Sequence, residues 1–203
     1  MSAVAVFQGF FIGAGMIIPL GAQNAYVLSQ GIKQNSHFIA ATICILCDLL
    51  LMSAGVFGSN ALFAGNERLV QVITWGGIVF LGVYGGLFLK NALLARGKAS
   101  DIVAPLHSRK TVVLTTLAVT LLNPHVYLDT LVIIGSIGNQ FIGMDKWAFL
   151  SGTILASITW FYTLSFFAAK MAPWLSQQHV QRWIDLIIAI IMWAIAISLI
   201  VSL

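Results

Sequence analysis

The chain has 203 residues, of which 60% are hydrophobic and 8% are charged, with a net charge of +4. Soluble domains carry about 25% charged residues, so this composition excludes a protein that exposes most of its surface to water. The chain also lacks the phosphate-binding loop G-x-x-x-x-G-K-[S/T] of ATPases. We therefore expect an all-α integral membrane protein that forms one domain over residues 1–203, is not an enzyme and needs no cofactor.

Apolar runs of about 20 residues are long enough to cross a membrane as helices. The sequence has about six such runs, and we expect the spans at residues 4–28, 38–63, 69–94, 111–134, 146–169 and 183–203.

Lys and Arg are distributed unevenly between the links that join these spans. Eight of the ten basic residues fall in or beside the links 29–37, 90–110 and 170–182, while Arg68 and Lys146 lie on the other side. The positive-inside rule predicts that these three links are cytoplasmic and that the C-terminus is outside. This rule also accounts for the net charge without a nucleic-acid partner. Six full crossings would place the N-terminus outside, whereas a re-entrant first segment would leave it inside with five crossings.

The polar link at residues 95–110 divides the chain into two sets of three segments, 1–94 and 111–203. Each set begins with a segment that carries a proline beside amide side chains. The first holds Pro19, Gly21, Gln23 and Asn24, and the fourth holds Asn123 and Pro124. An odd number of crossings per set inverts the second copy, and broken helices in inverted repeats are typical of transporter sites. The sequence therefore predicts two inverted three-helix repeats with proline-broken first and fourth segments.

Two acidic residues, Asp48 and Asp129, lie in the middle of apolar runs. A carboxylate at the centre of a span costs about 2.5–3.5 kcal/mol on insertion scales, so such residues indicate function. No Lys or Arg occurs at mid-span to pair with them. Their expected partner is a proton, a cationic substrate or both.

His125 and two cysteines also fall within apolar runs. His125 lies four residues before Asp129, where it could relay a proton or ligate a metal. Cys44 and Cys47 have the spacing of a thiol–disulfide pair, although buried cysteines usually pack as small hydrophobes.

Several short motifs resemble the lysine/arginine exporter family, the LysE/ArgO type, over nearly the whole chain. They are Gly21-Ala22-Gln23-Asn24, Gln30-Gly31-Ile32-Lys33, Asp48, Trp75-Gly76-Gly77, Leu122-Asn123-Pro124-His125-Val126-Tyr127-Leu128-Asp129 and Arg182-Trp183-Ile184. The Asn-Pro-His-Val-Tyr-Leu-Asp run is most similar to the arginine-exporting branch. The family usually has a proline where this chain has Ala22.

The resemblance implies export of basic amino acids across a bacterial inner membrane: L-arginine, and also L-lysine and analogues such as canavanine. Asp48 and Asp129 would take the cationic group, with Gln23, Asn24, Asn123 and Tyr127 around the rest of the substrate. Outward movement of a cation against an inside-negative potential favours antiport with protons.

Three alternatives remain open at this stage. A neutral amino acid could be the substrate, a divalent metal could bind Asp48, His125 and Asp129, or Cys44 and Cys47 could carry electrons. Homo-oligomerisation is also left open by the sequence.

Overall fold

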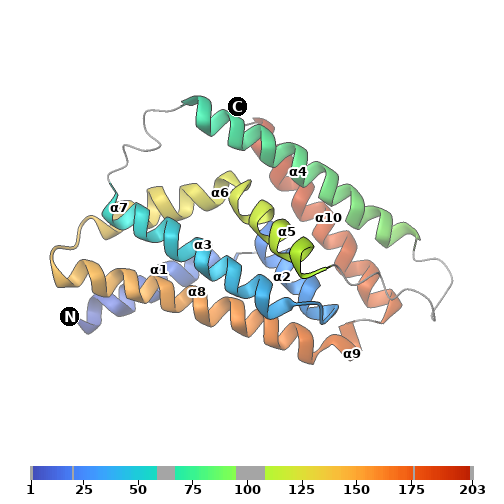
Figure 1. The fold of residues 1–203 in the computed structure, drawn as a ribbon, viewed down its shortest axis with the longest axis horizontal. Coiled ribbons are helices and arrows are strands. Elements are labelled where there is room, and N and C mark those ends of the chain that lie inside the picture. Colours follow the sequence, from blue (N-terminus) through green and yellow to red (C-terminus); the bar gives the residue numbers. More distant parts are fainter. Residues whose placement is uncertain (1, 20, 59–66, 95–107, 176, 202–203) are drawn as a thin grey trace.

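The computed structural model describes residues 2–19, 21–58, 67–94, 108–175 and 177–201 (Figure 1). All regular elements in these ranges are helices, which confirms the expected all-α class.

Four helices are long and apolar enough to cross a membrane: α3 His37–Phe57, α4 Glu67–Leu94, α8 Met144–Lys170 and α10 Gln178–Val201. The shortest has 21 residues, which at 1.5 Å per residue gives about 30 Å, the thickness of the hydrocarbon core. The chain is thus a multi-pass membrane protein. Helix α3 ends at Phe57, Gly58 is extended, and residues 59–63 of the predicted second span lie outside the described ranges.

Two further segments are bent pairs of helices. In the first, α1 Ala3–Ile17 and α2 Ala22–Ile32 meet at 80°. In the second, α5 Arg109–Leu121 is followed at 65° by a stretch made of α6 Pro124–Tyr127, a π-helical segment Leu128–Ile134 and α7 Gly135–Gly138. If each bent pair is one span, the total is six.

Some predicted boundaries change as a result. The first and fourth segments extend to Ile32 and Gly138 rather than to 28 and 134. The first link therefore shrinks from 29–37 to residues 33–36, and the last link holds the short helix α9 Ala172–Leu175.

Each bent pair of helices packs along one continuous helix from the other half of the chain. Gly9 of α1 lies against the backbone of Phe149 near the start of α8, and Gly31 of α2 lies against Ala168 near its end. A Cβ at Gly9 would lie 2.1 Å from the Phe149 carbonyl oxygen, so only glycine permits this approach. In the same way α5, the π-helical segment and α7 lie along α3. The remaining long helices, α4 and α10, lie side by side (Figure 1).

The first residues of α1 and of α8 lie at the same end of the helices. The backbone N–H of Ser2 donates to Asp145 Oδ1 at 3.0 Å, which places the start of α1 beside the start of α8. Lys33, at the opposite end of the bent pair, lies near Phe88 of α4 and Asp185 of α10. The C-terminal end of α10 lies beside the start of α4, so these two helices are antiparallel (Figure 1).

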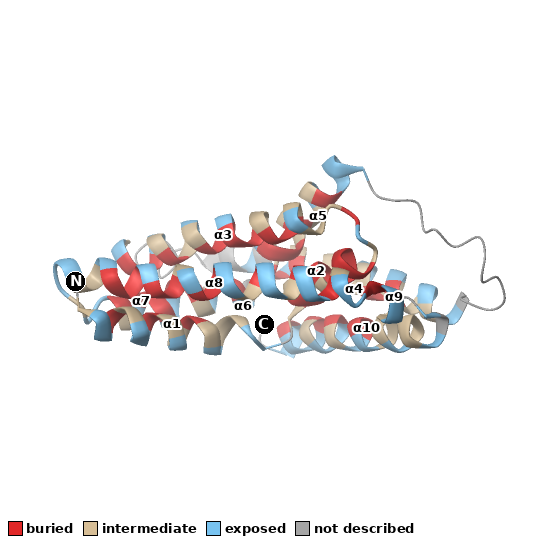
Figure 2. Ribbon diagram, turned by 90° about the horizontal axis from the view of Figure 1, so that it is seen from below, coloured by how far each residue is buried: buried red, intermediate tan, exposed pale blue. Residues whose placement is uncertain are grey.

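The outward faces of the helices carry many large apolar side chains, and the buried residues lie between the helices (Figure 2). Large side chains such as Phe11, Leu50, Val83 and Ile197 are at least 60% exposed. In a membrane these faces contact lipid tails.

Candidate functional site

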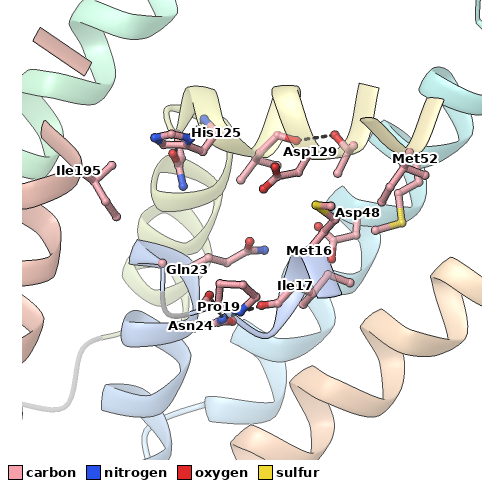
Figure 3. A pocket seen from close by; sticks show the side chains of 15 residues that line it. Met16, Ile17, Pro19, Gln23, Asn24, Asp48, Met52, His125, Asp129 and Ile195 are labelled. Atoms are coloured by element: carbon pink, nitrogen blue, oxygen red, sulfur yellow. Dashed lines mark hydrogen bonds between the residues drawn. The ribbon is translucent and has the colours of Figure 1, made fainter. Parts of the chain in front are cut away.

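A cavity of about 270 Å³ opens where the two bends meet α3 (Figure 3). This volume is near the lower end of small-molecule pockets, roughly 300 Å³. It is lined by most of the residues singled out in the sequence, together with several apolar side chains: Met16, Ile17, Pro19, Gly21, Gln23, Asn24, Asp48, Met52, Asn123, His125, Val126, Asp129, Thr130, Ile134 and Ile195. The described lining contains two acids and neither Lys nor Arg.

Asp48 lies in the middle of α3 and is only 3% exposed. Its Oδ2 accepts a 2.7 Å hydrogen bond from the hydroxyl of Ser157 on α8. Ser157 is itself completely buried. A carboxylate in a low-dielectric interior needs such a donor, because an unpaired buried charge is costly.

Asp129 reaches the same cavity from the second bent pair. It belongs to the π-helical segment Leu128–Ile134 and is partly exposed. Such turns are rare and often occur at functional sites. His125 lies close enough to interact electrostatically with Asp129, and Figure 3 shows both side chains on the cavity wall. The cavity therefore holds one acid from each half of the chain.

Gln23 and Asn24 are neighbours at the start of α2 but have different surroundings. Asn24 Nδ2 donates to the carbonyl oxygens of Ile17 at 2.7 Å and Pro19 at 2.9 Å, and its Oδ1 accepts from Trp160 Nε1 at 3.1 Å. The Asn24 amide thus satisfies backbone groups that the bend leaves without helical partners. Gln23 Nε2, although buried, has no hydrogen-bond partner in the described part of the chain. Gln23 is the amide that remains available to a ligand.

At the second bend, Asn123 caps the helix that follows. Its Oδ1 accepts from the backbone N–H of His125 at 3.2 Å, and Pro124 is the first residue of α6. Asparagine before a proline in the first helical position is a favoured way to begin a helix.

Tyr127 is not among the residues that line the described cavity. Its hydroxyl donates to the carbonyl oxygen of Leu121 at 2.7 Å, across the same bend.

Several residues at or beside the cavity were not found from the sequence, among them Met16, Met52, Ser157 and Trp160. Ser and Thr are common in membrane helices, so Ser157 carries no signal of its own. Only the packing of α3 against α8 shows its contact with Asp48.

The structure also shows where the side chains of the alternative metal site and of the alternative thiol pair lie. Among the described residues, no three His, Cys, Asp or Glu side chains are grouped closely enough to hold a metal ion. Cys44 and Cys47 are both free thiols buried within α3.

Comparison with known proteins gives a consistent result. Residues 14–203 match the family model of the LysE type translocator. The chain is 49% identical over 192 residues to a protein of Aeromonas salmonicida named as a putative amino-acid transporter, covering 95% of this chain and 93% of that one. It is 45% identical to arginine exporter proteins of Pectobacterium carotovorum, over 96% of both chains, and of Salmonella typhimurium, over 95% of this chain and 92% of that one.

No solved structure matches the chain. The family match covers nearly the whole length, and its members are transporters rather than enzymes. The chain therefore belongs to the LysE family of translocators, as the sequence motifs predicted.

Proposed function

We propose that this translocator exports basic amino acids, L-arginine foremost, from the cytoplasm in exchange for protons. The observation that carries the proposal is the pair Asp48 and Asp129, one from each half, in a single cavity whose described lining has no basic side chain. Relatives at 45% identity are named arginine exporters. A site of this charge favours a cationic substrate.

The two ends of an amino acid would meet different parts of the cavity. The guanidinium or ammonium group would pair with Asp48 and Asp129, since carboxylates match guanidinium geometry. The α-carboxylate would accept from Gln23 Nε2 and from the backbone N–H groups at the start of α2, where the helix dipole favours anions. Asn24 and Asn123 would act indirectly by holding the two bends in shape.

Coupling to protons follows from the membrane potential. Moving one positive charge outward costs about 2.3 kcal/mol per 100 mV. One proton entering for each cation leaving cancels that charge movement. A carboxylate that is protonated cannot pair with a guanidinium, so proton and substrate would compete for the same acids.

The inverted repeat and the membrane orientation belong to the same proposal. Each bent pair lies along the long helix of the opposite half, as two copies related by a two-fold axis would. Pro19 and Pro124, which lack a backbone N–H, stand at the two bends. The end of the helices that holds Lys33, Arg109 and Lys170 would face the cytoplasm. Both termini would then be outside, in a bacterial inner membrane.

The test is efflux of labelled arginine from proteoliposomes that contain the purified protein. Asp48→Asn and Asp129→Asn should each lose roughly 30-fold or more in rate, because removing one partner of a buried charge pair costs about 2–5 kcal/mol. Asp145→Asn is the matched control, since Asp145 binds the Ser2 N–H outside the cavity. Wild-type rates in both cavity variants would contradict the proposal. Retained transport of a neutral amino acid would favour that substrate class instead.

A further inference from the structure

A second group of polar side chains begins at Gln23 on the cavity wall and continues between helices α2, α3 and α5. On α2, Gln23, Tyr26 and Gln30 are three and four residues apart, so they share one face of the helix. On α5, Thr116 and Thr120 are four residues apart and share a face in the same way. On α3, Cys44 lies one turn before Asp48. We call these six residues the inner polar seam: Gln23, Tyr26, Gln30, Cys44, Thr116 and Thr120.

The inner polar seam is buried, yet much of it has no partner. Tyr26 is 1% exposed, Gln30 2% and Thr120 0%. Four buried atoms of the seam make no hydrogen bond within the described residues: Gln23 Nε2, the Tyr26 hydroxyl, Gln30 Oε1 and Thr120 Oγ1. Folded proteins rarely leave buried polar atoms unpaired, and several in one place indicate a polar ligand.

Neighbouring members of the seam lie close enough to one another to interact. Cys44 lies near both Gln23 and Thr120, and Gln23 lies near Asp48. A water molecule can bridge polar groups that lie this close together.

Farther along the seam, the Tyr26 hydroxyl lies near Thr115 and Thr116. The ring of Tyr84 on α4 closes this part, with its centroid 6.2 Å from that of Tyr26. The titratable groups that face the seam are therefore Asp48, Cys44, Tyr26 and Tyr84.

The seam leads from the cavity toward one end of the helices. It begins at Gln23 beside the bend and follows α2 to Gln30, one residue before Gly31 lies against Ala168 of α8. This is the end of the helices that carries Lys33 and Lys170.

We propose that the inner polar seam binds a file of water molecules that passes protons between Asp48 and the cytoplasmic end of the protein. The inference rests on the proton antiport proposed above. The seam would pass the proton, and the cavity would bind arginine. On the cytoplasmic side, the proton and arginine would therefore pass through different parts of the protein.

The chemistry of the seam suits protons better than arginine. Its side chains are neutral, and hydroxyl and amide groups both donate and accept hydrogen bonds. None of the six seam residues has a carboxylate that could pair with a guanidinium. In each transfer a water or hydroxyl oxygen accepts one proton and gives another to its neighbour, so no seam group keeps a net charge after the proton has passed.

The experiment compares Tyr26→Phe and Thr120→Val with Tyr162→Phe and Thr159→Val, which make the same chemical changes away from the seam. The Tyr162 hydroxyl pairs with Thr42 and that of Thr159 with the Leu155 carbonyl oxygen. Proteoliposomes carrying an internal pH dye report arginine-driven proton movement, and equilibrium binding of arginine is measured on the same preparations.

We expect proton movement to slow about tenfold in each seam variant, the rate factor for one lost hydrogen bond of about 1.4 kcal/mol. Arginine binding and the control variants should match the wild type. Thermal stability of the seam variants should stay close to that of the wild type, because each hydroxyl bonds water rather than another protein group. Wild-type proton movement in both seam variants, or loss of arginine binding in them, would overturn the proposal.

A second measurement does not depend on the transported substrate. Radiolytic hydroxyl-radical labelling marks side chains beside bound water, and we expect labelling of Tyr26 and Cys44 despite their burial. Met192, buried in the apolar core and 0% exposed, is the internal control. Unlabelled Tyr26 and Cys44 would refute the water file even if arginine export is confirmed. Labelling of both in a protein that does not export arginine would overturn the proposed function and leave the hydrated seam standing.

Discussion

The Ser157 hydroxyl donates to Asp48 Oδ2 at 2.7 Å, joining α8 of the second half to α3 of the first. Both residues are buried, at 0% and 3% exposure. The bond fixes the orientation of the carboxylate at the wall of the cavity. An acid at the centre of a membrane helix is therefore held by a partner more than 100 positions away in the chain.

Ser157→Ala should weaken arginine export while the protein still folds. Loss of a hydrogen bond to a charged group costs about 1.5–3 kcal/mol, which corresponds to roughly a tenfold or greater drop in rate. Efflux from proteoliposomes measures the effect. Ser151→Ala is the control, because the Ser151 hydroxyl bonds only the nearby Ala148 carbonyl oxygen. Equal rates in the two variants would show that the bond does not matter for transport.

Asn24→Asp should disrupt the first bend. The change keeps the side-chain shape but removes both protons donated to Ile17 and Pro19, leaving carbonyl oxygens that cost about 1–3 kcal/mol each when unpaired. We expect a lower melting temperature in detergent and little export. Trp160→Phe removes only one bond to Asn24, so its effect should be smaller. If Asn24→Asp melts like the wild type but fails to bind arginine, Asn24 contacts the substrate directly.

The sequence predicted the membrane spans and the cavity acids for physical reasons that act locally. Long apolar runs must be helical in lipid, and a carboxylate within such a run is too costly to occur without a role. Asp48 and Asp129 could be singled out on this basis, and Gln23 because it is an amide beside Pro19 in an apolar segment.

Other features depend on contacts between distant helices and could not be predicted. Ser157 becomes visible only when α8 lies against α3. No local sequence pattern predicts the π-helical turn around Asp129. No local pattern predicts either that Asn24 is hydrogen-bonded while Gln23 Nε2 has no partner among the described residues.

Gly135→Ala should reduce the amount of folded protein. A Cβ there would lie 2.7 Å from the carbonyl oxygen of Gly55, where the second bent pair lies against α3. Backbone cannot move aside cheaply, and overpacking of this kind costs about 1–3 kcal/mol. Gly82→Ala is the control, since a Cβ at Gly82 meets no described atom within 4 Å. Fluorescence-detected size-exclusion chromatography compares the two, and equal yields would show that the α3 contact tolerates a methyl group.

Export of arginine should depend on the proton gradient. Proteoliposomes are loaded with labelled arginine and placed in a more acidic outer medium. Valinomycin and potassium hold the membrane potential constant. Protons then move down their gradient as arginine leaves, so addition of a protonophore should slow net efflux to the passive rate. Asp48→Asn should show little response to the gradient, because the group shared by proton and cation is gone. An unchanged rate after the gradient is collapsed would mean that the two acids bind arginine without exchanging it for protons.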